Sequence, residues 1–199
     1  MNKVKEDSKQ TRDDIMEAAF RCFDSNGFKL SSLAMIAEEA NVTRGAIYWH
    51  FKDKNDLYRE VVKAVLEDAD LSVRASNMPP EWDYRRKMQE IFWYAQDDSS
   101  KKIAFIYKTM NTVQQSDEFE DLKEAIQTEK INLLRYLTEE TGRHILEKDL
   151  KNTHSPSDYA SALFLMFEGM FLMNNISVGL QKDRGHIERY IDLIIADLI

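Results

Sequence analysis

Apolar residues recur at helical spacing along most of the chain. The first apolar stripe has members at i, i+3, i+4, i+7 and i+8: Ile15, Ala18, Ala19, Cys22 and Phe23. Such spacing is typical of one face of an amphipathic helix. Residues 103–110 begin with the alternation of a strand, but the sequence offers no second strand to pair with them, so we assign them to a helix. The pattern predicts an all-α protein of about nine helices.

Polar residues mark where the first helices begin and end. We expect N-caps at residues whose side chains can accept hydrogen bonds from first-turn N–H groups: Thr11 (with Asp14 as a capping box), Ser31 or Ser32, Thr43 and Asp53. Helix ends are expected at Asn26-Gly27, Asn41 and Phe51. The N-terminal part therefore holds three helices, of which the second and third are short. A fourth helix from about 53 to 76 follows.

A two-turn helix, a tight turn and a second short helix form a helix-turn-helix arrangement. The third helix directs polar and aromatic residues outward, where they suit a DNA groove and its phosphates. Arg44 can donate two hydrogen bonds to a guanine edge, and Gly45 allows close approach to the DNA. The candidate DNA contacts are Ser31, Ser32, Thr43, Arg44, Gly45, Tyr48, Trp49, His50, Lys52 and Lys54. The alternative for Tyr48, Trp49 and His50, above all for Trp49, is partial burial against the fourth helix.

These residues carry a family resemblance. The stretch TRGAIYWHFKDKNDL (Thr43 to Leu57), preceded by SSLAMIAEEANV (Ser31 to Val42), resembles the DNA-binding segment of TetR-family repressors, and within that family the AcrR-type regulators of multidrug efflux. The resemblance extends from about Thr11 to Leu66. It implies a homodimeric repressor that a small molecule releases from a palindromic operator, and it implies a link to efflux genes. Residues 1–55 are then the DNA-binding domain and 56–199 the ligand-sensing and dimerisation domain.

The last two helices are the expected dimer interface. After the linker Asn77-Met78-Pro79-Pro80, Ser155-Pro156 opens a helix that is apolar nearly all round from Ala160 to Met173. A helix that is apolar on every side is buried on every side, so we expect a two-fold four-helix bundle; the alternative is a monomer with a larger core. The predicted interface residues are Phe164, Phe171, Ile187, Tyr190, Ile191, Ile194, Ile195 and Leu198.

Aromatic and methionine residues of the middle helices are candidates for an apolar effector site, although each is also compatible with a plain core. The candidate ligand contacts are Met88, Phe92, Phe105, Tyr107, Met110, Glu129, Leu133, Phe167 and Glu168. Glu129 and Glu168 interrupt apolar stripes, and a carboxylate there needs a partner. The partner is either an internal Arg, Lys or hydroxyl, or a cationic ligand. We therefore expect a lipophilic effector, cationic if one of these carboxylates faces it.

Composition and charge narrow the class of protein. Only 6 Gly and 3 Pro occur in 199 residues, too few for the many turns of a sandwich or barrel. The net charge of −8 taken alone disfavours a nucleic-acid partner. The acidic residues lie mostly after residue 60, however, because the first 60 residues carry 10 Lys and Arg against 11 Asp and Glu. Net charge therefore does not exclude DNA binding by the N-terminal part. Met1 to Arg12 lack a signal-peptide apolar segment, and no apolar run of ~18 residues occurs. We expect a cytoplasmic protein with no membrane partner.

The sequence predicts no enzyme. None of His50, His144, His154 and His186 has a metal-ligand spacing with another His, Cys or acid, and one cysteine forms neither an internal disulfide nor a structural zinc site. No phosphate loop or nucleophile elbow occurs, so we expect no cofactor and no metal. The runner-up hypothesis is an all-α interaction protein whose N-terminal motif docks a protein partner. The sequence names neither the effector, the operator, the regulated genes nor the sign of regulation.

Overall fold

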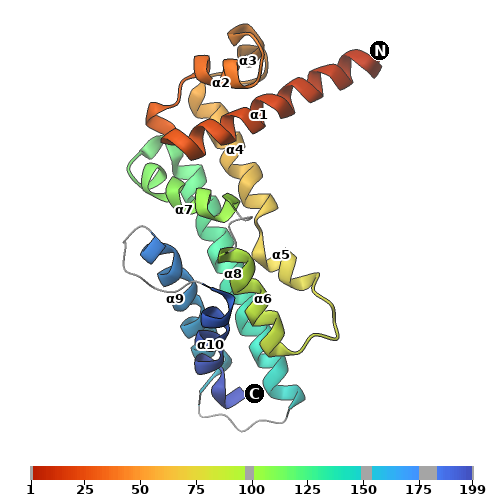
Figure 1. Cartoon of the computed structure of the whole chain (residues 1–199), viewed down its shortest axis with the longest axis vertical. Coiled ribbons are helices and arrows are strands. Elements are labelled where there is room, and N and C mark those ends of the chain that lie inside the picture. Colours follow the sequence, from red (N-terminus) through yellow and green to blue (C-terminus); the bar gives the residue numbers. More distant parts are fainter. Residues whose placement is uncertain (1, 97–100, 149–153, 175–182, 199) are drawn as a thin grey trace. The chain divides into compact units, whose positions relative to one another are not determined.

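The computed structural model describes residues 2–96, 101–148, 154–174 and 183–198, and these ranges contain helices and no strand (Figure 1). The all-α prediction is therefore confirmed. The elements are α1 (Asn2–Leu30), α2 (Leu33–Glu39), α3 (Arg44–His50), α4 (Lys54–Asp68), α5 (Leu71–Ser76), α6 (Tyr84–Gln96), α7 (Lys101–Gln114), the 3-10 helix η1 (Asp117–Phe119), α8 (Glu120–Glu147), α9 (Pro156–Asn174), α10 (Arg184–Ile194) and the 3-10 helix η2 (Ala196–Leu198). Residues 103–110 lie within α7, as predicted, and α9 begins at Pro156.

The start of α1 differs from the prediction. Thr11 lies inside the helix, which already begins at Asn2. The residues before Thr11 include no Gly or Pro, and Lys, Glu and Gln among them favour helix, so the backbone continues through the predicted cap. The predicted stop is confirmed, because Gly27 leaves the helical region with φ 75° and ψ 165°. Gly tolerates positive φ without steric cost.

The chain forms two compact units, and each is described by itself. The first unit comprises the chain up to Asp68 together with Phe105–Ile126. One cluster in its core joins four aromatic side chains, of which Phe23 and Phe28 come from α1, Tyr58 from α4 and Phe119 from η1. The ring centroids of Phe28 and Tyr58 are 4.6 Å apart, and Phe119 lies 5.3 Å from each of them. The ring of Phe23 meets Tyr58 edge-on at 5.0 Å.

The second unit comprises Ala69–Ala104 and the chain from Gln127 onward. Here α10 packs along α6, and ion pairs join neighbouring helices. Arg85 Nε lies 2.7 Å from Asp192 Oδ1, between α6 and α10. Lys87 Nζ lies 2.5 Å from Glu140 Oε1, between α6 and α8. The predicted domains, 1–55 and 56–199, are defined by function and not by compactness, and this division stays a prediction.

The predicted connecting helix from about 53 to 76 is interrupted in the structure. α4 ends at Asp68, and α5 begins at Leu71 with Asp70 as its N-cap. Asp70 Oδ1 accepts hydrogen bonds from the backbone N–H groups of Ser72 (2.8 Å) and Val73 (3.1 Å). An N-cap residue has non-helical dihedral angles, so this carboxylate divides the expected helix and accounts for one more helix than predicted.

Candidate nucleic-acid interface

Side-chain caps hold α2 and α3 at a tight turn. Ser32 Oγ accepts a hydrogen bond from Met35 N at 3.2 Å, and Thr43 Oγ1 accepts one from Ala46 N at the same distance. Between the helices Asn41 adopts a positive φ of 54°, a conformation that Asn tolerates better than most residues. The helix-turn-helix predicted from Ser32, Asn41 and Thr43 is therefore present in the structure.

The two sides of α3 differ sharply in exposure. Ile47 is fully buried, and Phe51, which ends the helix, is 2% exposed. On the opposite side Trp49 is 82% and Tyr48 52% exposed, while His50 is half-buried. The alternative that Trp49 packs against the fourth helix is therefore wrong. The indole of Trp49 is therefore accessible to a binding partner.

The polar members of the predicted set lie on this exposed side. Thr43, Arg44 and Gly45 are exposed at the start of α3, and Ser32 is exposed at the start of α2. A Cβ added at Gly45 would meet only Thr43 Oγ1, at 3.7 Å, so nothing in the chain itself requires glycine there. The predicted reason, close approach to DNA, stays a prediction.

Ser31 and Lys54 lie elsewhere than predicted. Ser31 is 2% exposed, and its hydroxyl lies within hydrogen-bond distance of the carbonyl oxygens of Cys22 (3.0 Å) and Gly27 (2.8 Å). Lys54 Nζ donates to the carbonyl oxygens of Phe28 (2.9 Å) and Ser31 (3.0 Å), and burial lowers the pKa of this ammonium. Both residues satisfy backbone groups at the end of α1, so we correct their assignment from DNA contact to structural support.

Lys52 keeps an exposed side chain just beyond α3. Its backbone N–H donates to Asp56 Oδ2 at 2.9 Å, while Asp53 Oδ1 accepts from Asp56 N at 2.8 Å. These reciprocal bonds confirm Asp53 as the predicted cap of α4. They also fix the backbone that carries Lys52, so the lysine stands at a defined position next to the exposed side of α3.

The predicted ligand contacts do not form one group. Phe105 and Met110 pack into the core of the first unit, where the Phe105 ring lies 5.0 Å from that of Phe20, and Tyr107 is half-buried in the same unit. The second unit holds the other six: Met88, Phe92, Glu129, Leu133, Phe167 and Glu168. Phe92 and Phe167 meet edge-on at 5.6 Å. Phe105 and Met110 are thus core residues, in line with the alternative reading of the sequence.

The two carboxylates on apolar stripes have different surroundings. Glu168 Oε2 lies 2.7 Å from Lys130 Nζ, an internal partner of the kind that the sequence left open. Glu129 is half-buried; burial and the charge of Asp70 raise the pKa of its carboxyl, while a hydrogen bond with Asn132 lowers it. Glu168 therefore needs no cationic ligand to offset its charge.

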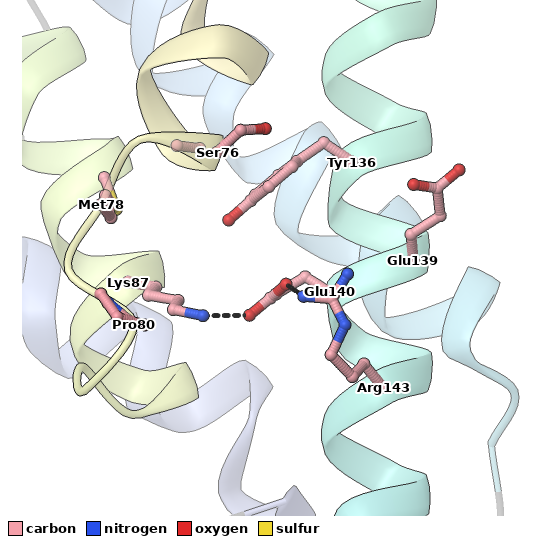
Figure 2. Close-up of a pocket in the computed structure, with 9 residues that line it drawn as sticks. Ser76, Met78, Pro80, Lys87, Tyr136, Glu139, Glu140 and Arg143 are labelled. Atoms are coloured by element: carbon pink, nitrogen blue, oxygen red, sulfur yellow. Dashed lines mark hydrogen bonds and ion pairs between the residues drawn. The ribbon is translucent and has the colours of Figure 1, made fainter.

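A polar pocket of about 310 Å³ opens in the second unit (Figure 2). Its lining comes from the end of α5, the segment after it, α6 and α8: Ala75, Ser76, Met78, Pro80, Lys87, Tyr136, Glu139, Glu140 and Arg143. None of these residues was predicted as a ligand contact. The sequence signal that could have indicated them is weak, because Lys87 and Glu140 are opposite charges separated by 53 positions.

Four of the predicted dimer contacts are buried within the chain. Ile187, Ile191 and Ile195 are fully buried and Leu198 is 3% exposed, so the predicted helix face packs against the chain's own helices and is not free for a partner. Phe164, Tyr190 and Ile194 are half-buried, and the side chain of Phe171 lies outside the described residues. The exposed apolar residues of these helices are Leu165 (69%) on α9 and Leu193 (76%) on α10. The four-helix bundle itself stays a prediction.

Within the described ranges, His, Cys, Asp and Glu side chains form no group of three or more that could hold a metal ion. Among the helices whose residues the structure describes, none is long and apolar enough to cross a membrane.

Known proteins resemble the chain most closely over the helix-turn-helix. A sequence model of the family described as bacterial regulatory proteins, tetR family, matches residues 15–61. The chain is 51% identical over 59 residues to the HTH-type transcriptional regulator AcrR of Shigella flexneri, and 43% identical over 83 residues to the HTH-type transcriptional regulator TtgR of Pseudomonas putida. These matches span 30% and 42% of this chain, but only 27% and 40% of the two relatives.

Similarity of fold extends over nearly the whole chain. SmeT, the repressor of the Stenotrophomonas maltophilia multidrug efflux pump SmeDEF, aligns over 96% of this chain and 91% of its own, with a TM-score of 0.67 and 25% identity. SmeT is also known as a complex with triclosan. The sequence resemblance is thus concentrated at the N-terminal end, while the arrangement of helices is shared throughout.

Proposed function

The chain belongs to the TetR family of bacterial regulatory proteins, and from this premise we propose that it is a sequence-specific DNA-binding repressor of transcription. The curated relatives and SmeT are named as regulators or repressors, which agrees with the prediction that the chain is not an enzyme. The efflux repressor SmeT supports efflux genes as the regulated targets.

The exposed side of α3 is the observation that carries this proposal. Ile47 anchors the helix in the core, so the opposite side presents Arg44, Tyr48 and Trp49 in a fixed orientation. A recognition helix in the major groove reads bases with its N-terminal residues. Arg44, the first residue of α3, stands where a bidentate contact to a guanine edge is made. Tyr48 and the exposed Lys52 are then phosphate contacts.

In this proposal the protein binds DNA as a homodimer. Two recognition helices about 34–36 Å apart engage successive major-groove faces of a palindromic operator. Leu165 on α9 and Leu193 on α10 are largely exposed, and the two helices contact each other, which supports this assembly. We assign the dimer contact to α9 and α10, where Phe164, Tyr190 and Ile194 are half-buried.

A small lipophilic effector releases the repressor in this proposal. The SmeT–triclosan complex supports a small-molecule ligand in a protein of this fold. Release requires that the effector bind the DNA-competent and the DNA-free conformations with different affinity. The second unit is the proposed sensing part, since six predicted ligand contacts and the pocket of Figure 2 belong to it.

The proposal is tested by selecting sequences that bind the protein from random duplex DNA. Binding of the selected sequence is then titrated at several salt concentrations. We expect a palindromic consensus and a steep salt dependence. Arg44→Ala costs about 1–3 kcal/mol on the selected sequence and relaxes the preference for one base. An unenriched pool, or binding that is insensitive to salt, supports the alternative that α2 and α3 dock a protein partner.

A further inference from the structure

The pocket of the second unit has an unusual balance of charge. Glu140 is 6% exposed, and its carboxylate binds two cations: Lys87 Nζ at 2.5 Å and the guanidinium of Arg143. One negative charge is thus surrounded by two positive charges. Glu139, the remaining charged lining residue, is exposed and points away from Lys87 and Tyr136 (Figure 2). The four charged lining residues sum to zero; because Arg143 and Glu139 are exposed, the charges on the inner wall of the pocket are those of Lys87 and Glu140.

Hydrogen-bond donors outnumber acceptors on this wall. An ammonium has three N–H groups and a guanidinium five, so one carboxylate satisfies only part of the capacity of Lys87 and Arg143. Tyr136 directs its hydroxyl toward the Lys87 side of the pocket (Figure 2). Burial, followed by the charge of Glu140, raises the pKa of Tyr136 to about 12, so this hydroxyl stays protonated at neutral pH and can donate.

The rest of the lining is apolar or small. Met78 and Pro80 lie opposite the ring of Tyr136 (Figure 2), Ala75 also lines the pocket, and Ser76 adds one hydroxyl. Thioether sulfur and an aromatic ring both contact flat apolar groups well. The volume of about 310 Å³ lies at the small end of the range for ligand pockets.

We propose that this pocket binds a small organic anion, a molecule with one carboxylate on a flat apolar body. The carboxylate lies between the Lys87 ammonium and the Tyr136 hydroxyl, and the apolar body lies against Met78 and Pro80. A cation is unsuited, because it meets Lys87 and Arg143 and because the buried carboxylate of Glu140 already has two partners. The effector role of this anion rests on the proposed function; the binding site does not.

Isothermal titration calorimetry of the full chain with three probes of equal shape tests the charge preference. The probes are benzoate, which is anionic, benzamide, which is neutral, and benzamidine, which is cationic. We expect saturable binding of benzoate at one molecule per chain, and no heat of binding from the other two. Benzamidine binding as tightly as benzoate, or absence of benzoate binding, overturns the proposal.

Variants locate the site. Lys87→Met removes the ammonium, and we expect benzoate to bind about ten-fold to hundred-fold more weakly, as for a lost charged hydrogen bond. The double variant Lys87→Met/Glu140→Gln should lose the same benzoate affinity. It leaves no unbalanced buried carboxylate, so it serves as the test if the single variant does not fold. Lys123→Gln is the control away from the pocket, since Lys123 pairs with the more exposed Glu120 on one helix of the other unit.

Glu140→Gln gives the most decisive test, because the proposal predicts that this variant binds benzoate more tightly than the native chain. Removing this charge frees Lys87 and raises the positive charge of the pocket, so benzoate should bind several-fold more tightly. Benzoate affinity that is unchanged in both Glu140→Gln and the double variant places the anion elsewhere and overturns the proposal.

A separate measurement keeps the two proposals apart. Calorimetry contains no DNA, so failure of benzoate binding overturns the pocket assignment and leaves the DNA-binding proposal as it stands. Failure to select a DNA sequence overturns the proposed function and leaves benzoate binding as it stands. When both hold, benzoate should release a fluorescent operator from the native chain at lower concentration than from Lys87→Met; equal release overturns the effector role.

Discussion

The two units of the molecule differ in their aromatic clusters and in the burial of their ion pairs. In the first unit the side chains of the interhelical pair Arg12–Glu60 are 39% and 43% exposed, whereas those of Lys87 and Glu140 in the second are 17% and 8% exposed. In the first unit Tyr58 and Phe119 lie in a cluster of rings with centroid distances of 4.6 to 6.1 Å. In the second unit charged pairs such as Lys87–Glu140 and Lys130–Glu168 join separate helices. Apolar contacts are insensitive to the charge of a ligand, whereas a buried ion pair responds to any charge placed beside it. We therefore expect the ring cluster to hold the first unit fixed, and under the proposed function the buried ion pairs of the second unit are the groups that a charged ligand affects.

Removing one ring from the first unit should cause the largest loss of stability. Phe119 is 1% exposed and contacts two other rings, so Phe119→Ala leaves a cavity and costs about 3–5 kcal/mol. Chemical denaturation followed by circular dichroism measures this cost. A cost below 1 kcal/mol contradicts the view that aromatic packing closes the first unit.

Breaking an ion pair of the second unit should cost less. Lys87→Met leaves Glu140 buried with Arg143 as its remaining partner, so we expect a loss of about 2–3 kcal/mol in the free energy of unfolding. The neutral double variant Lys87→Met/Glu140→Gln should recover most of it. If the double variant is less stable than the single variant, the pair itself stabilises the unit, and buried charge is not the source of the loss.

Alkaline pH should weaken the second unit further. Burial raises the pKa of Tyr84 and of Tyr136 from an ordinary value of 10.0 to about 12 in each case. A raised pKa in the folded chain means that this stabilisation is complete below pH 10.0 and is lost as the pH rises through 12.

Denaturation at a series of pH values measures this loss. We expect stability to fall by about 2–3 kcal/mol across this interval from Tyr84 alone, with a smaller addition from the half-buried Tyr136. The Tyr84→Phe/Tyr136→Phe variant, which has no hydroxyl to ionise at either position, should show a clearly smaller fall. An identical pH profile in the variant contradicts the assignment.

Two neighbouring lysines of the first unit, Lys52 and Lys54, should differ in their roles: we expect Lys54 to stabilise the fold and Lys52 to contact DNA. Lys54→Met loses two hydrogen bonds to carbonyl oxygens and should cost about 1–2 kcal/mol of stability, without changing the salt dependence of DNA binding. Lys52→Ala should leave stability unchanged and reduce the salt slope by about 1. Equal salt slopes for both variants contradict the distinction.

A small effect on stability is also expected from Trp49, a largely exposed aromatic residue. Trp49 is 82% exposed, so Trp49→Ala should change the free energy of unfolding by less than about 0.5 kcal/mol. Operator binding should nevertheless weaken strongly, as measured by fluorescence anisotropy. If the variant binds the operator as tightly as the native chain does, Trp49 is not a DNA contact.

Local rules predicted the first unit better than the second. The caps Ser32, Thr43 and Asp53 depend on bonds within three or four residues, and the sequence reveals such bonds directly. Thr11 failed because helix propagation through its neighbours overrode a plausible cap. A local pattern therefore predicts a helix end well only where the flanking residues also favour it.

Long-range packing accounts for the other errors. Ser31 and Lys54 bind carbonyl groups that the fold brings to them, and no local pattern predicts that proximity. Ile187, at the start of the apolar stripe of α10, was assigned to the dimer because the sequence does not say which of two apolar surfaces a helix turns to its own chain. The Lys87–Glu140 pair joins positions 53 apart and was invisible for the same reason.

The division of α3 into a buried and an exposed side has a consequence for evolution. Ile47 and the Thr43 cap hold the helix, whereas positions 44, 48 and 49 contribute little to the core. Substitutions at these three positions can accumulate without loss of the fold. Under the proposed function, descendants of this chain can therefore acquire new operators one residue at a time, because each substitution changes DNA binding and leaves the fold intact.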